Sequence, residues 1–257
     1  MIIETGPRLC CPIVELREYA LHPGARETLI ALFDRHFVEG QEEAGIRVIG
    51  QFRDLDREDR FVWFRGFESM AARRTALADF YGGPLWATHK DAANATMIDS
   101  DNVLLLKPAS PNSGFNLRGM MRPSWQATIG QEGGDGTVLL LSIHYVRPEG
   151  AADFSSRFHA EVMPLLEAVG APAPACFVTE HAVNDFPRLP VRQGENVLVT
   201  VQLFRQHSEL DRHRQAIAAD AGWRAAEERV AFLRSREPEY FRLTPTNRSL
   251  LGGKSAP

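Results

Sequence analysis

The chain contains two stretches, residues 13–108 and 138–244, that follow the same order of sequence patterns. Each stretch opens with a strand-like run that leads to a proline, Pro23 in the first and Pro148 in the second. A helical pattern follows in both and ends near a glycine. Self-similarity on this scale indicates two copies of one structural unit, each needing the other to bury its hydrophobic face. The repeat therefore predicts two half-cores, with a functional site in the space between them.

Hydrophobic periodicity and turn residues predict the same elements in each copy. Ser69 is a candidate helix N-cap and Pro84 can begin a further helix. The first copy has predicted strands at 14–21, 46–52, 61–67 and 102–107 and predicted helices at 25–44, 70–80 and 84–94. The second has predicted strands at 138–146, 176–182, 196–204 and 240–243 and predicted helices at 151–169 and 210–236.

The order β-α-β-β-α-β is that of the ferredoxin-like unit. We therefore expect an α+β fold in which two tandem ferredoxin-like βαββαβ units pack sheet to sheet as an α+β barrel. The first unit should span residues 12–108 and the second 137–251. The segment 109–136 between them is rich in Gly, Ser, Pro and Asn, which is typical of a linker.

Composition excludes several classes of function. The 257 residues carry a net charge of −4 with both signs interspersed, so no nucleic-acid or membrane partner is expected. No apolar run approaches the roughly 20 residues of a membrane span, and no basic segment precedes an apolar one at the N-terminus. Three cysteines do not make a disulfide framework. We predict a cytoplasmic protein that is either a monomer with an internal pseudo-dimer or a homodimer.

Several motifs of the first copy together carry a family resemblance. They are Val-Glu-Leu-Arg-Glu-Tyr at 14–19 followed by Pro23-Gly24, Phe-Val-Trp-Phe-Arg-Gly-Phe-Glu-Ser at 61–69, Ala-Ala-Arg at 71–73, and the Trp86 helix with the strand at 103–108. As a set they resemble the NIPSNAP family, within the dimeric α+β barrel group. The second copy fits loosely, with Ser142 in place of Arg17 and His144 in place of Tyr19.

The resemblance implies two ferredoxin-like units pairing through their sheets, and it implies no particular reaction. Relatives in the wider group include cofactor-free monooxygenases, small isomerases and haem enzymes.

Strand parity suggests which side chains face a cavity, because successive side chains point to opposite faces. Val14 and Leu16 share a face that suits packing beneath helices, so the mixed face is expected to point into the barrel. That face offers candidate ligand-binding residues Glu15, Phe61, Trp63, Arg65 and Ser142, together with Arg17, Tyr19 and His144. Such a lining suits a small, partly apolar ligand, which could be anionic. The alternative is that Glu15 and Arg17 simply neutralise each other, since buried charges are normally paired.

His144 is the first candidate for catalysis because an imidazole can move a proton near neutral pH. Arg17 and Tyr19 could hold an oxyanion or a carbonyl oxygen. The alternatives are a polar lining role for His144 and a half-buried packing role for Tyr19.

No cofactor or metal is expected. His207, Asp211 and His213 lie close in sequence, but histidines six residues apart do not share a helical face. We therefore expect a protein that binds a small organic molecule between the halves, as a cofactor-independent monooxygenase or isomerase. The alternative is a non-catalytic binding or protein-interaction module whose barrel is filled by side chains. An open, mixed-polarity pocket between the halves would favour the first hypothesis.

Overall fold

A computed structural model describes residues 10–126 and 136–253 of the chain. The first half contains a long helical run, interrupted by a π-helical turn at Phe33–Phe37. Its elements are β1 (Ile13–Leu21), α1 (Arg26–Leu32), α2 (Val38–Glu43), β2 (Arg47–Asp54), β3 (Arg60–Phe67), α3 (Met70–Gly82), α4 (Pro84–Asn94) and β4 (Met97–Pro108).

The second half follows the same order. A 3-10 turn at Pro148–Gly150 precedes its helices, and a π-helical turn at Phe158–Val162 again interrupts the first helical run. Its elements are β5 (Val138–Val146), α5 (Ala151–Arg157), α6 (Met163–Ala168), β6 (Ala175–Thr179), β7 (Asn196–Phe204), α7 (His207–Ala219), α8 (Ala221–Ala231) and β8 (Glu239–Pro245).

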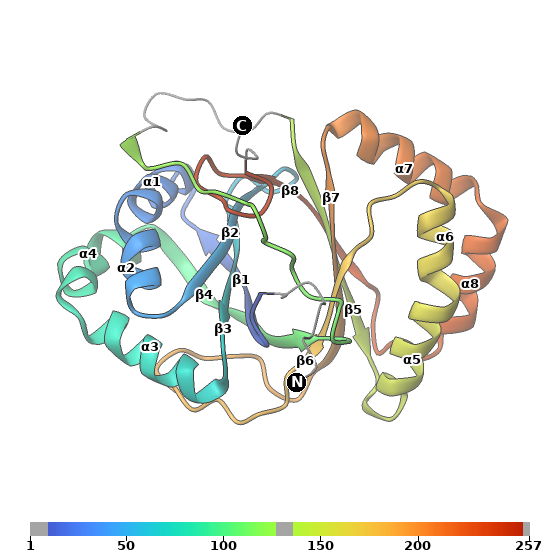
Figure 1. Cartoon of the computed structure of the whole chain (residues 1–257), viewed down its shortest axis with the longest axis horizontal. Helices are drawn as coiled ribbons and strands as arrows, with labels where there is room; N and C mark the ends of the chain where they lie inside the picture. Colours follow the sequence, from blue (N-terminus) through green and yellow to red (C-terminus); the bar gives the residue numbers. More distant parts are fainter. Residues whose placement is uncertain (1–9, 127–135, 254–257) are drawn as a thin grey trace, which may run out of the picture.

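The eight strands form one closed antiparallel barrel in the order β1-β3-β2-β8-β5-β7-β6-β4. The two halves join at two seams, where Phe52 lies opposite Pro245 and Lys107 lies opposite Val178. Helices α1–α4 cover one side of the barrel and α5–α8 cover the opposite side (Figure 1). The molecule is therefore layered as helices, barrel and helices, and each half-sheet has an inner face and a helix-covered outer face.

The barrel interior is apolar, which reverses the predicted strand parity. Val14 and Leu16, expected beneath helices, instead pack inside the barrel against residues of both halves such as Leu141 and Ile143. A barrel of eight strands is just wide enough for its own side chains to fill or for one small ligand, so the side chains decide whether a cavity remains. The cavity beside Leu16 inside the barrel measures about 10 Å³. The prediction of an open site between the halves is therefore wrong.

Helix ends show where local sequence signals succeeded and failed. The predicted N-cap is confirmed, because Ser69 Oγ accepts a hydrogen bond from the Ala72 amide at 3.1 Å. The helical stretch predicted at 210–236 consists of two helices, because the helix breaks at Asp220. The Asp220 carboxylate accepts from the Trp223 amide at 2.7 Å and begins a second helix.

The turns between the middle strands of each half reach across to the other half. The short β2–β3 turn brings Asp56 to Arg242 of β8, at 3.0 Å between Oδ2 and Nε. The long β6–β7 connection, residues 180–195, crosses below the first half (Figure 1), where the Arg192 amide donates to the Val103 carbonyl at 2.8 Å. The first half is therefore covered by a long loop, whereas the second is flanked by a short turn.

Two further features concern chemistry and environment. Cys10 and Cys11 form a disulfide between sequence neighbours, which ties no distant parts of the chain together, and Cys176 is a buried free thiol. Among the described helices, none is both long and apolar enough to cross a membrane.

Candidate functional site

The polar residues predicted to line a cavity face outward from the barrel, toward the helices of their own half. Glu15, Arg17 and Tyr19 lie on β1, whereas Ser142 and His144 lie on β5. The predicted set is thus divided between two separate spaces on opposite sides of the barrel. These spaces have opposite character, because the first is filled by side chains and the second is open.

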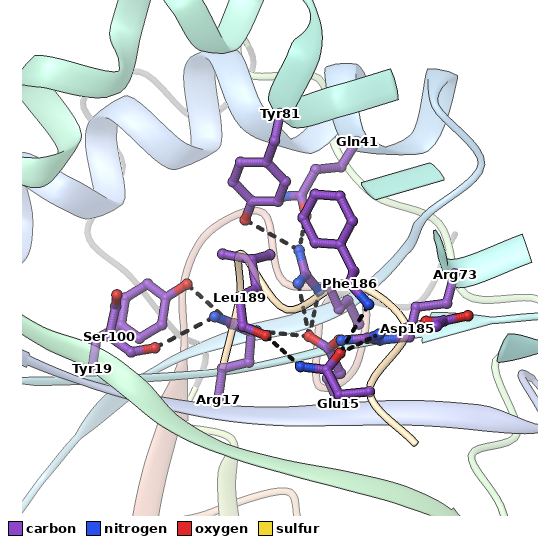
Figure 2. Close-up of polar contacts among 12 residues, drawn as sticks. Glu15, Arg17, Tyr19, Gln41, Arg73, Tyr81, Ser100, Asp185, Phe186 and Leu189 are labelled. Carbon is purple, nitrogen blue, oxygen red and sulfur yellow. Dashed lines mark hydrogen bonds and ion pairs between the residues drawn. The ribbon is translucent and has the colours of Figure 1, made fainter. Parts of the chain in front are cut away.

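Glu15 is the centre of a buried ion cluster in the first half (Figure 2). Its Oε2 accepts from Arg17 Nη1 at 2.8 Å and from Arg65 Nε at 2.8 Å, and its Oε1 accepts from Arg73 Nε at 2.6 Å. All four side chains are at most 1% exposed. Although burial by itself would raise the pKa of Glu15, the three guanidinium groups hold it well below its usual range. The pairing of Glu15 with Arg17, which the sequence left open, is therefore part of a larger charged core.

The space around this cluster is closed. Arg17 Nε donates to the Tyr19 hydroxyl at 3.1 Å, and the rings of Phe61 and Trp63 pack on Tyr19 at 6.2 and 6.0 Å between centroids. The β6–β7 connection covers the cluster from outside, where Arg73 Nη1 contacts Asp185 Oδ1 at 3.2 Å. Figure 2 shows Phe186 and Leu189 of this connection over the same group. The structure thus brings six of the predicted residues together, but they pack against one another and do not line a cavity. They are Glu15, Arg17, Tyr19, Phe61, Trp63 and Arg65.

The corresponding space in the second half contains a pocket of about 560 Å³, which we call the β5–α7 pocket. This volume lies within the range of small-molecule sites. Its floor is the outer face of β5, β7 and β8, and its walls come from α6–α8 and the π-helical turn. The lining residues are Asp56, Leu140, Ser142, His144, Phe158, Leu166, Thr200, Gln202, His213, Arg214, Ile217, Ala218, Trp223, Tyr240 and Arg242.

The two spaces differ because of the side chains at matching positions of the strands. In the first half Arg17 pairs across the strands with Trp63, whereas in the second Ser142 pairs with Thr200. Two residues along the same strands, the first half has Glu15 opposite Arg65, whereas the second half has Leu140 opposite Gln202. At the same place on helices α3 and α7, Tyr81 is replaced by Ala218. Smaller side chains on both surfaces, together with the missing loop cover, leave the pocket open.

His144 is the most buried titratable group in this pocket. Its side chain is 4% exposed and lies among Phe154, Phe158 and Tyr240, at 5.6, 5.5 and 6.4 Å between ring centroids. Burial, helped by the positive charge of Arg234, lowers the pKa of His144 from 6.5 to about 3. The imidazole is therefore neutral at physiological pH. Its Nδ1 is buried and has no hydrogen-bond partner within the described part of the chain.

His213 provides a second buried imidazole from the helical wall. It is 7% exposed, and its ring packs on Phe204 at 5.2 Å between centroids. Burial lowers the pKa of His213 as well, and its Nδ1 also lacks a partner among the described residues. Gln202 is fixed on the floor, because its Nε2 donates to the Pro172 carbonyl at 3.2 Å. The inner pocket thus presents neutral polar groups on an apolar frame.

Charged side chains occur only among the more exposed members of the pocket lining. Asp56 and Arg242 pair with each other at the rim, with side chains 47% and 37% exposed, and Arg214 on α7 is also exposed.

Sequence reasoning found two members of this pocket, Ser142 and His144, and missed the others. Thr200 and Gln202 alternate on β7 on the face that pairs with Ser142 and Leu140, so strand parity could have found them. His213 was considered only as a metal ligand. Its burial depends on packing between a helix and a sheet, which its own sequence neighbourhood does not report.

Two further observations concern metal binding and other hollows. Among residues 10–126 and 136–253, no three His, Cys, Asp or Glu side chains lie close enough to hold a metal ion. A larger hollow of about 1090 Å³ borders Cys10, Cys11 and Gly66.

Comparison with known proteins places the first half in a family and the whole chain in a fold. Residues 14–111 match the sequence profile of the NIPSNAP family. No match was found among curated proteins.

Several solved structures share the fold over the full chain. A proposed monooxygenase from Lactobacillus acidophilus is 13% identical, with a TM-score of 0.55 over 96% of this chain and 100% of that chain. A proposed monooxygenase from Fusobacterium nucleatum is 10% identical, with a TM-score of 0.58 over 96% and 97%. An anthrone oxidase-like protein is 10% identical, with a TM-score of 0.55 over 95% and 96%. At these identities the likeness concerns the barrel fold, which extends through both halves.

Proposed function

Residues 14–111 belong to the NIPSNAP family, and on that premise we propose that the protein binds a small organic molecule in the β5–α7 pocket of its second half. The observation that supports this most directly is the pocket itself, about 560 Å³ in volume, with the imidazoles of His144 and His213 in its lining. A bound molecule can form hydrogen bonds to these rings that no residue of the described chain provides. The first half, closed around Glu15, then serves as structural support.

We also propose that the halves, residues 12–108 and 137–251, are tandem ferredoxin-like units joined by residues 109–136. The equal placement of the π-helical turns at Phe33–Phe37 and Phe158–Val162 supports this. Both seams of the barrel lie within one chain, which supports a monomer with an internal pseudo-dimer.

A second candidate function is proton transfer on the bound molecule, as the first step of an isomerisation or of a direct reaction with oxygen. Two neutral imidazoles in the lining of one pocket favour it, because each can accept a proton. With its pKa lowered to about 3, His144 is a weak base, so only a ligand with an acidic C–H or O–H bond would react. Binding is therefore better supported than catalysis.

Filling the pocket tests the binding proposal. Thr200→Trp places on β7 the side chain that Trp63 provides at the matching position of β3. Native mass spectrometry of the purified protein, alone and with planar aromatic compounds, should detect a bound molecule in the wild type. Thr200→Trp should lose it, whereas Thr88→Trp, on the exposed face of α4, should retain it. Equal binding by wild type and Thr200→Trp would contradict the proposal.

A further inference from the structure

Resting on the proposed function, we infer that the ligand of the β5–α7 pocket is an uncharged, flat aromatic molecule with hydroxyl groups, which it presents to His144 and His213. Three observations support this class of ligand: the charge of the lining, its hydrogen-bonding groups and its walls.

The first observation is the distribution of charge. The buried polar residues of the lining are all neutral, namely Ser142, His144, Thr200, Gln202 and His213. A carboxylate or ammonium group buried among them would lose its hydration without gaining an opposite charge, which disfavours its binding. The first half shows the contrast, since the same face there holds Glu15 against three arginines.

The second observation is the pair of imidazoles in the lining, His144 and His213. Nδ1 of each ring is enclosed by protein, which leaves Nε2 as the nitrogen that can reach a ligand. A neutral imidazole carries its proton on one of its two nitrogens, so Nε2 either donates or accepts, and a hydroxyl group suits both cases. His144 comes from the sheet and His213 from α7, so the two rings belong to opposing surfaces of the pocket. A ligand with one hydroxyl group for each ring would satisfy both.

The third observation is the shape of the walls. Phe158 and Trp223 supply aromatic surface, while Leu140, Leu166 and Ile217 supply aliphatic surface. The pocket thus lies between the outer face of the barrel and a layer of helices, with aromatic side chains in its lining. Flat aromatic rings pack well against such surfaces, because offset stacking and edge contacts add to the burial of apolar area.

Arg214 at the rim is the feature that would favour an anion instead. Its side chain is exposed, so solvent screens its charge, and surface charges of this kind contribute little to binding. The buried neutral lining should therefore dominate the choice of ligand.

Calorimetric titration of the intact protein near neutral pH with three matched probes, 2-naphthol, 2-naphthoate and naphthalene, tests the inference. We expect 2-naphthol to bind at least about tenfold more tightly than 2-naphthoate, which corresponds to about 1.4 kcal/mol. His144→Phe should weaken 2-naphthol severalfold and leave naphthalene nearly unchanged, because only the hydroxyl group loses its partner.

The outcomes separate this inference from the proposed function. If 2-naphthoate binds as tightly as 2-naphthol and Thr200→Trp abolishes both, the uncharged ligand class is wrong and the pocket stands. If no probe binds, both proposals fail. They also fail if Thr200→Trp and the control Thr88→Trp both bind the probes as tightly as wild type does, because the pocket is then not the binding site.

Discussion

Replacing His144 should change how the stability of the protein depends on pH. In the folded chain burial lowers the pKa of this imidazole to about 3, whereas an unfolded chain exposes it with a pKa of about 6.5. Between these values the unfolded chain binds a proton that the folded chain does not. The folded state is therefore favoured fully above about pH 6.5, and this advantage is lost as the pH falls toward 3.

The size of the effect follows from the two pKa values. At about pH 5 the extra proton stabilises the unfolded chain by about RT ln(1 + 10^1.5), or about 2 kcal/mol, and at about pH 7.5 the effect nearly vanishes. Urea unfolding at the two pH values, extrapolated linearly to water, measures the difference. His144→Gln should reduce the loss of unfolding free energy on acidification by about 2 kcal/mol.

A matched control is His159→Gln, in the π-helical turn next to Phe158, because the His159 side chain is exposed in the folded state. It should leave the loss on acidification unchanged. If His144→Gln and wild type lose the same free energy between the two pH values, the imidazole is not held neutral in the folded protein. The reasoning behind the neutral pocket would then be refuted.

Two further predictions concern other buried charges. Glu15→Gln should lower the unfolding free energy by about 3–5 kcal/mol in urea, because it leaves three buried arginines without their carboxylate. Glu27→Gln, which breaks a pair with Arg53 at 2.6 Å in which the glutamate is 61% exposed, should cost less than about 1 kcal/mol. Burial raises the pKa of Asp34 to about 7, so its contribution is present below about pH 4 and is lost as the pH rises through 7. Asp34→Asn should therefore be more stable than wild type by up to about 4 kcal/mol at about pH 8 and lose this advantage near pH 4, and equal stability at both pH values would contradict it.

The order of elements could be predicted because turn and cap residues mark their ends. Ser69 begins a helix and Pro84 begins the next, as predicted. Asp220 carries the same kind of signal, an acid whose side chain can cap, but it lies within a long helical pattern and was missed. Helix caps could therefore be predicted only where the hydrophobic periodicity of the surrounding sequence also changed.

The inner face of the barrel could not be chosen from the first strand alone. Both faces of β1 are buried, one inside the barrel and one beneath helices, so burial and alternation gave no preference. β5 was more informative, since Leu139, Leu141 and Ile143 form a fully apolar face opposite Ser142 and His144. The interior of a barrel requires the more apolar face of each strand. In β5 this face, with Leu139, Leu141 and Ile143, could be identified from the sequence.

The open pocket depends on pairs of residues that are distant in sequence. Ser142 lies opposite Thr200, and their small size matters only because Ala218 on α7 is also small. None of these residues is unusual in its own neighbourhood. The vacancy becomes visible only when the two halves are compared position by position.

The position of β8 in the barrel has a consequence for how the protein is made. β8 pairs with β2 on one side and with β5 on the other, so one of its partners lies near the beginning of the chain. During synthesis the first half leaves the ribosome long before residues 239–245 do, and β2 meanwhile keeps an unpaired edge. Such an edge can pair with strands of neighbouring nascent chains. Translation that stops before Glu239 would therefore release an incomplete barrel that is prone to aggregate. Pairing of β8 closes the barrel and protects the nascent chain from such contacts.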